Sequence, residues 1–209
     1  MKALFKTLLS SIAAGITIGM GGSVYLACEN KYVGAILFSV ALLSICYMGT
    51  YLYTGKIGFL AEKFSLSTVS HLAVGLLGND IGATLVGKVV RFSSPKLAGV
   101  AQELSAKKLE IDFLKVVGLG ALCGILMYLA VKTFVAKGTP LGVMYCIPVF
   151  ILCGFEHSIA DIFYMACGGR SIFELPVFLF TVAVILGNTI GAMALSYIYR
   201  FATAEKKAD

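Results

Sequence analysis

The sequence has 209 residues, of which 59% are hydrophobic and only 13% are charged, and its formal net charge is +6. Soluble globular domains carry about 25% charged residues, so this composition excludes a water-soluble globular protein and predicts an integral membrane protein. Lys and Arg are not concentrated in any one stretch, which gives no support for a nucleic-acid partner. The six cysteines are scattered singly without metal-ligand spacing, so we expect no metal or cofactor.

Six segments are apolar over about 20 residues, the length that crosses the hydrocarbon core of a membrane. They lie at 7–28, 32–54, 66–90, 113–136, 141–166 and 175–200. The first follows Lys2 and Lys6 as a targeting signal would, but its length and its glycines are typical of a retained, packed helix. Because unpaired backbone groups are costly in lipid, each segment is predicted to be helical. We therefore expect an all-α membrane protein with six transmembrane helices.

The pattern Leu-Gly-Asn-x-Ile-Gly-Ala occurs twice, at 77–83 and at 186–192. Such self-similarity predicts two structural repeats, each holding three of the six helices. Since three is odd, the second repeat starts from the opposite face of the membrane, and the repeats are predicted to be inverted. The expected single channel domain, 1–209, comprises repeat one at 1–92, a connector at 93–112, repeat two at 113–200 and a cytoplasmic tail at 201–209. The basic start and tail favour cytoplasmic termini.

Two polar, glycine-containing stretches interrupt the second and fifth predicted helices. The stretch 49–58 contains three glycines and four hydroxyl side chains, and the stretch 154–161 contains three ionisable residues. Interrupted helices at corresponding positions of two halves are typical of a binding site or pore in membrane transport proteins. The sequence therefore predicts that helices two and five are broken and that solute passes between them.

The fifth helix contains the most informative ionisable groups, because such groups are expensive inside a membrane and usually have a function there. His157 lies in the predicted break beside Glu156. A histidine side chain has a reference pKa of about 6.5 and can exchange protons near neutral pH. The alternative is a core histidine that bonds a backbone carbonyl. For Glu156 we expect a role in capping freed amides or in pairing with a basic group.

Asn79 and Asn188 occupy equivalent positions in the two copies of the repeated pattern. An amide side chain both donates and accepts hydrogen bonds, so we expect these residues to bond backbone groups freed at the breaks, with solute contact as the alternative. The flanking glycines are four residues apart, a spacing that permits close helix contact. They are Gly78 and Gly82 in one copy and Gly187 and Gly191 in the other.

The chain resembles the formate/nitrite transporter family of pentameric, aquaporin-like anion channels. The resemblance is carried by Phe-Glu-His-Ser-Ile-Ala at 155–160, by Gly-Asn-x-Ile-Gly at 78–82 and 187–191, and by the stretch 49–54. These matches extend from the first to the last predicted helix. The resemblance implies a homopentamer in the inner (plasma) membrane, in contact with lipid, that conducts small weak-acid anions. Formate is the first candidate, followed by nitrite and hydrosulfide.

The resemblance also implies roles for individual residues. It implies a narrow pore in each protomer with apolar constrictions on both sides of a central histidine. The loop constriction is expected at Leu52, Tyr53 and Thr54, the central histidine is His157, and Lys108 matches the lysine of the vestibule. The other expected pathway residues are Phe155, Glu156, Asn79 and Asn188. Passage is expected to be proton-coupled or assisted by the histidine.

Four positions depart from the family pattern, and the first is Tyr53, where the family usually has phenylalanine. Gly124 stands where the family usually has asparagine, Asp80 replaces an apolar residue, and Asp161 replaces an asparagine. Two ionised carboxylates near an anion path would repel the anion, so we expect both aspartates to be turned away, paired with a base or protonated.

Three other functions remain open on the sequence. The first is an aquaporin-like channel for neutral solutes. The second is an intramembrane enzyme, although Ser158 and His157 are neighbours, and neighbours on a helix point about 100° apart. The third is a purely structural membrane subunit.

Overall fold

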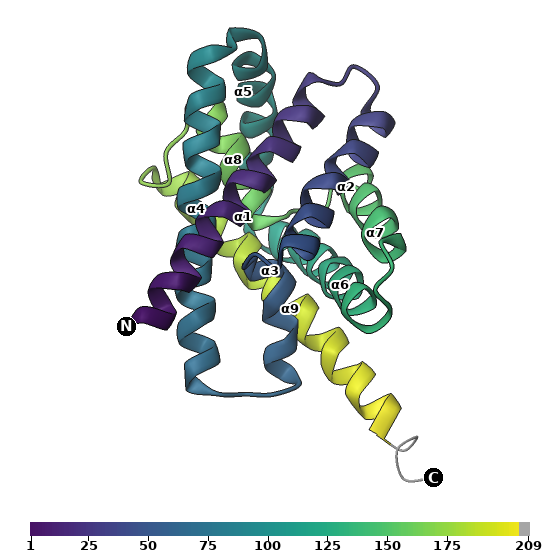
Figure 1. The fold of residues 1–209 in the computed structure, drawn as a ribbon. Coiled ribbons are helices and arrows are strands. Elements are labelled where there is room, and N and C mark those ends of the chain that lie inside the picture. The colour runs from purple at the N-terminus through teal and green to yellow at the C-terminus, as the bar shows by residue number, and fades with distance from the viewer. Residues whose placement is uncertain (205–209) are drawn as a thin grey trace.

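The computed structural model describes residues 1–204, and all regular structure in that range is helical (Figure 1). The elements in chain order are α1 (Lys2–Ala27), α2 (Lys31–Met48), α3 (Tyr53–Lys56), the 3₁₀ helix η1 (Ile57–Ala61), α4 (Leu66–Ser93), α5 (Pro95–Leu109), α6 (Phe113–Lys137), α7 (Leu141–Leu152), α8 (Ser158–Cys167) and α9 (Leu175–Ala204).

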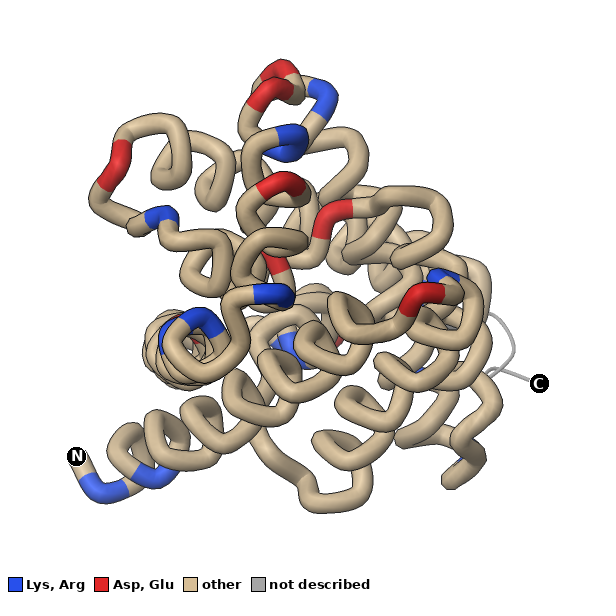
Figure 2. Tube along the Cα trace, turned by 90° about the horizontal axis from the view of Figure 1, so that it is seen from above, with Lys and Arg blue, Asp and Glu red and all other residues tan. Residues whose placement is uncertain are grey.

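Five helices in the described part of the chain, α1, α2, α4, α6 and α9, are long and apolar enough to cross a membrane. The helices α7 and α8 are shorter but also apolar. Figure 2 shows long uncharged stretches of the trace between the charged residues. The length and composition of these helices indicate a multi-pass membrane protein.

The predicted connector at 93–112 contains a helix, α5, that was not predicted from the sequence. Its first turn has strong start signals, because Pro95 occupies the first helical position and the Ser94 hydroxyl accepts a hydrogen bond from the Leu97 amide at 3.5 Å. α5 packs against α8 (Figure 1). The predicted tail at 201–209 begins inside α9, and residues 205–209 lie outside the described range.

Both predicted helix breaks are present. α2 ends at Gly49, which has a φ of 65°, and the chain becomes helical again at Tyr53. α7 ends before Gly154, which has a φ of 69°, and α8 begins at Ser158. Positive φ is a conformation that glycine adopts without the steric cost of a Cβ. The second break is shorter than predicted, since Ser158 to Asp161 form the first turn of α8 rather than part of the interruption.

The helices pack most extensively in two pairs, α1 with α4 and α6 with α9. Glycines allow the backbones in each pair to approach closely. A Cβ placed on Gly15 would meet the backbone carbonyl of Asn79, and one placed on Gly124 would meet that of Asn188. Gly124, which departs from the family pattern, is therefore a glycine at the contact between α6 and α9.

The repeated glycines have the predicted role in these helix pairs. A Cβ on Gly82 would meet the carbonyl of Ile12 in α1, and one on Gly191 would meet the carbonyl of Ala121 in α6. The equivalent glycine of each half thus contacts the backbone of the helix that begins that half. This packing confirms the prediction of close helix contact and fixes Asn79 and Asn188 against the breaks.

Candidate functional site

Asn79, on α4, bonds the chain around the first break through three hydrogen bonds. Its Oδ1 accepts from the Tyr53 amide at 2.8 Å, and its Nδ2 donates to the carbonyls of Ser11 at 2.8 Å and Tyr51 at 2.9 Å. The side chain is fully buried. Buried backbone groups without partners are costly, so this one amide satisfies the Tyr53 amide and the Tyr51 carbonyl, which the interruption leaves outside helical hydrogen bonding. Its bond to Ser11, which lies within α1, attaches the break to that helix.

Asn188, on α9, makes the same set of bonds at the second break. Its Oδ1 accepts from the Ser158 amide at 3.0 Å, and its Nδ2 donates to the carbonyls of Gly120 and Glu156, each at 2.8 Å. In each half the asparagine also bonds a helix that lies earlier in the chain. Asn79 bonds Ser11 of α1 and Asn188 bonds Gly120 of α6, and the two residues of each pair are 68 positions apart. The predicted bonding role of the two asparagines is confirmed.

His157 is buried and joins the two breaks. Its Nε2 lies 2.9 Å from the Thr54 hydroxyl oxygen, and its Nδ1 accepts a hydrogen bond from the Ala160 amide at 3.2 Å. A nitrogen that accepts carries no proton, so we assign the neutral tautomer in which the Nε2–H donates to Thr54. The Phe150 ring stacks on the imidazole with centroids 5.7 Å apart.

Lys108 reaches from α5 to the start of α8 and contacts two carboxylates. Its Nζ donates a hydrogen bond to Glu156 and lies 3.0 Å from Oδ1 of Asp161. The side chains of all three residues are largely buried, with 14%, 3% and 6% of their surface exposed. Glu156 therefore pairs with a basic group, and Asp161 pairs with the same base, as the sequence analysis expected.

A cavity of about 140 Å³ opens beside this cluster. His157, Phe155, Lys108 and Asp161 contribute to its wall, and their side chains provide both polar and apolar surface. The remaining lining residues are Tyr25, Leu104, Phe150, Ile151, Gly154, Ala160 and Tyr164. A cavity of this size has room for a solute of a few non-hydrogen atoms.

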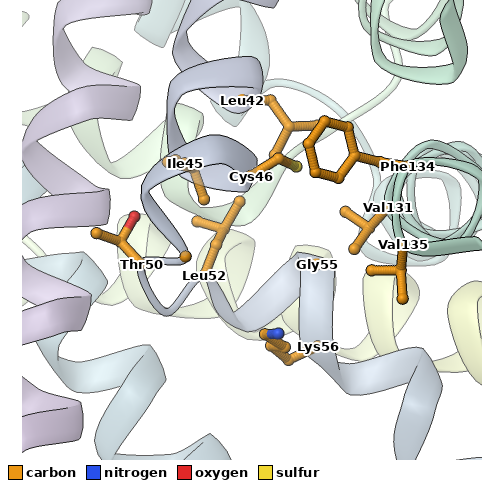
Figure 3. A pocket seen from close by; sticks show the side chains of 11 residues that line it. Leu42, Ile45, Cys46, Thr50, Leu52, Gly55, Lys56, Val131, Phe134 and Val135 are labelled. Carbon is orange, nitrogen blue, oxygen red and sulfur yellow. The ribbon is translucent and has the colours of Figure 1, made fainter. Parts of the chain in front are cut away.

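A second cavity, of about 210 Å³, adjoins the first break. Figure 3 shows the apolar side chains of Leu52, Val131 and Phe134 around it, and Lys56 on the side toward α3. Leu52 is almost completely buried. Thr54 follows Leu52 by two residues and bonds His157, which lines the first cavity. The Thr54–His157 contact thus connects the walls of the two cavities.

The comparison with known families agrees with this arrangement. The family model described as "Formate/nitrite transporter" matches residues 1–202. The chain belongs to the formate/nitrite transporter family. Members of this family are channels or transporters and not enzymes, which removes the enzymatic alternative.

Relatives in the family are distant in sequence, but their alignments with this chain cover most of both proteins. The chain is 24% identical over 198 residues to the formate channel FocA of Haemophilus influenzae, an alignment that covers 80% of this chain and 68% of that protein. It is 28% identical over 235 aligned positions to the nitrite transporter NirC of Salmonella typhimurium, with 96% and 85% covered.

Solved structures share the fold. A pentameric formate channel with formate bound superposes with a TM-score of 0.81, at 24% identity and 98% coverage of both chains. An ion channel described as of the FNT family superposes with a TM-score of 0.86, at 23% identity, covering 95% of this chain and 90% of that one.

Other predicted positions of this family member lie away from the two cavities. The Tyr53 side chain is directed to α9, where its hydroxyl is 2.8 Å from that of Thr189, and it is not part of either wall. Asp80 lines a separate, largely apolar cavity between α4 and Ile162, Ile172 and Phe173, so it is turned away from the cavity beside His157, as expected.

Sequence reasoning missed Phe150, whose ring covers the imidazole of His157. The residue lies in an apolar stretch of α7, and nothing in its sequence surroundings distinguishes it from the other core residues. Lys56 was also not singled out, because a lysine near a predicted helix end is most often a solvated charge.

Proposed function

We propose that this protein is a membrane channel for small monovalent anions of weak acids, with formate as the first candidate and nitrite and hydrosulfide as further ones. The observation that carries the proposal is the buried contact between Thr54 and His157, which joins the two helix breaks between two cavities. Membership of the formate/nitrite transporter family, and the chain's similarity to the formate channel FocA and the nitrite transporter NirC, support the substrate class.

The proposed topology has six membrane crossings. Five are the long helices, and α7 with α8 forms the sixth, interrupted one. The matching bonds of Asn79 and Asn188 support two inverted repeats, 1–92 and 113–200, joined by a connector at 93–112. We propose the inner (plasma) membrane as the location, with both termini and the tail at 201–209 cytoplasmic.

In the proposed pathway the solute enters the cavity beside Lys108 and Phe155, passes His157 and Thr54, and leaves past Leu52. An anion cannot cross an apolar constriction cheaply, because its charge loses hydration there. The same loss of hydration favours protonation of a weak acid. The Nε2–H of His157 can hold the solute by a hydrogen bond in place of Thr54, or exchange a proton with it.

The remaining predicted residues have supporting roles in this proposal. Glu156 holds Lys108, Tyr53 fixes α3 to α9, and Asn79 and Asn188 keep the broken segments in position. We further propose a homopentamer surrounded by membrane lipid. The similar structure described as a pentameric formate channel supports this assembly.

Isotope-labelled formate uptake into proteoliposomes tests the function. We expect the wild-type protein to transport formate and the His157→Asn variant to lose most of that rate. The matched control is His71→Asn, since His71 is the other histidine of the chain and contacts Thr7 rather than the cavities. An unchanged rate and pH profile for His157→Asn would remove the histidine from the mechanism.

A channel for neutral solutes would share the fold, and osmotic swelling distinguishes it. Vesicles containing the protein should swell no faster in glycerol or urea than empty vesicles. Rapid swelling together with an absence of formate uptake would favour the neutral-solute channel.

A further inference from the structure

Asp161 competes with Glu156 for a single ammonium group. Lys108 Nζ contacts both carboxylates, and its distance to Asp161 Oδ1 is 3.0 Å. The second oxygen of Asp161, Oδ2, is buried and has no hydrogen-bond partner among residues 1–204. Asp161 also lines the cavity of about 140 Å³ beside His157.

The groups around these three residues do not supply a second positive charge. His157 is in its neutral tautomer, and phenols and thiols are uncharged at neutral pH. The phenols near the cluster are those of Tyr25 in α1 and Tyr164 in α8, and the thiol near it is that of Cys123 in α6. Lys88 and Arg91 of α4 line a different cavity, on the side of α8 that carries Ile162 and Met165. Within the described residues Asp161 has one cation, Lys108, within ion-pair distance.

One ammonium group cannot neutralise two buried carboxylates. An uncompensated charge inside a membrane protein is expensive. The N-terminus of α8 favours a negative charge in its first turn, but this contribution is small compared with the cost of burying an ion. The cluster is neutral when one carboxyl carries a proton. Glu156 already accepts a hydrogen bond from Lys108, whereas Asp161 has an oxygen free to hold the proton.

We propose that Asp161 controls the entry of anions by setting the charge of this cavity. When Asp161 holds a proton taken from water at the cavity mouth, the cluster is neutral and a small monovalent anion can enter. When Asp161 releases that proton to water, the cavity becomes negative and repels the anion. The inference rests on the proposed channel function and adds to it a residue that makes anion entry depend on pH.

Equilibrium exchange of labelled formate in proteoliposomes tests the inference, with equal formate and equal pH on both sides. The wild type should slow as the pH is raised, because Asp161 ionises. Asp161→Asn has an isosteric, permanently neutral side chain, so its exchange rate should not fall through this charge as the pH is raised. At the alkaline end the variant should exceed the wild type by about tenfold, the effect of removing one nearby like charge. The protonation of formic acid itself changes with pH in the same way for both proteins. The readout is therefore the ratio of the exchange rate of the variant to that of the wild type.

Asp161→Glu is the matched control, because it keeps a titratable carboxyl and should keep the decline in rate with pH. If the Asn variant does not reconstitute, Asp161→Ser is also uncharged and carries the same expectation. A wild type and an Asn variant with parallel pH profiles would overturn the inference. A wild type that exchanges none of formate, nitrite and hydrosulfide would instead contradict the proposed function.

Infrared spectroscopy provides a readout that does not depend on transport. The difference between the infrared spectra of the wild type and Asp161→Asn near neutral pH should contain the C=O stretch of a buried protonated carboxylic acid, while the contribution of Asp80, whose Oδ1 is also buried without a partner, cancels. A difference spectrum without that band would overturn the assignment of the proton to Asp161 whatever the exchange rates are.

Discussion

Thr54 and His157 are 103 positions apart in sequence, yet the hydroxyl oxygen of one lies 2.9 Å from Nε2 of the other. Thr54 follows Gly49, the glycine with positive φ at the end of α2. His157 follows Gly154, the glycine with positive φ after α7. Their hydrogen bond is therefore the point at which the two interrupted helices meet.

Replacing Thr54 by valine keeps the shape of the side chain but removes the acceptor of the His157 Nε2–H. An unpartnered buried donor costs about 1–3 kcal/mol, and the imidazole loses the contact that orients it. We expect formate flux to fall by about tenfold, equivalent to about 1.4 kcal/mol, as measured by uptake into proteoliposomes. Thr54→Ser retains a hydroxyl and should stay near the wild-type rate. Equal rates for the valine and serine variants would show that the hydrogen bond has no part in transport.

The two asparagines at the breaks should be essential for stability. Asn188→Leu and Asn79→Leu each remove three hydrogen bonds to backbone groups, two of which lie at the break and have no helical partner. Each group orphaned at the break costs about 1–3 kcal/mol. We expect a large loss of thermal stability in detergent for both. Asn30 is the control: it caps α2 at an exposed position, so Asn30→Ala should cost only about 1 kcal/mol. Similar melting temperatures for all three variants would contradict this role.

Two glycines of α6 should respond oppositely to alanine. A Cβ at Gly124 would meet the backbone carbonyl of Asn188, whereas a Cβ at Gly118 meets no described atom within 4 Å. Gly124→Ala should separate α6 from α9 and cost about 1–3 kcal/mol. Gly118→Ala should be neutral or stabilising by up to about 1 kcal/mol, the difference in helix propensity. Thermal unfolding measures both, and a tolerated Gly124→Ala would mean that the helix contact is looser than described.

Glu62 should give the folded protein a pH-dependent contribution to stability. Partial burial raises the pKa of its carboxyl, but hydrogen bonds from Lys132 at 2.7 Å and Tyr128 at 2.8 Å outweigh that effect, so its pKa lies below the usual value. A lowered pKa in the folded state adds stability above the unfolded pKa of about 4.3. That contribution is lost as the pH falls further, through the folded value.

We expect Glu62→Gln to lose about 1 kcal/mol at neutral pH and little below about pH 4. Thermal unfolding of the two proteins across pH measures this difference. A constant difference between wild type and variant at all pH values would exclude the ion pair as its cause. The exposed carboxylate of Glu174, which pairs with Arg170 on the surface, is the control, since such pairs contribute about 0–1 kcal/mol.

The sequence alone determined the membrane class, the positions of the apolar helices and the two breaks. These features are local, because hydrophobic length, a glycine and a run of polar residues act on the segment that contains them. The role of Asn79 and Asn188 also followed from the sequence, since a polar amide repeated beside two breaks has few other partners in lipid.

Only the tertiary structure decided which side chains meet. The pairing of Lys108 with both Glu156 and Asp161, the stacking of Phe150 on His157 and the bond to Thr54 join segments from different helices. These contacts depend on how closely the glycine-lined pairs α1 with α4 and α6 with α9 approach, and on the placement of α5 against α8. Packing of this kind is a property of the whole chain, because each contact requires several distant surfaces to fit at once.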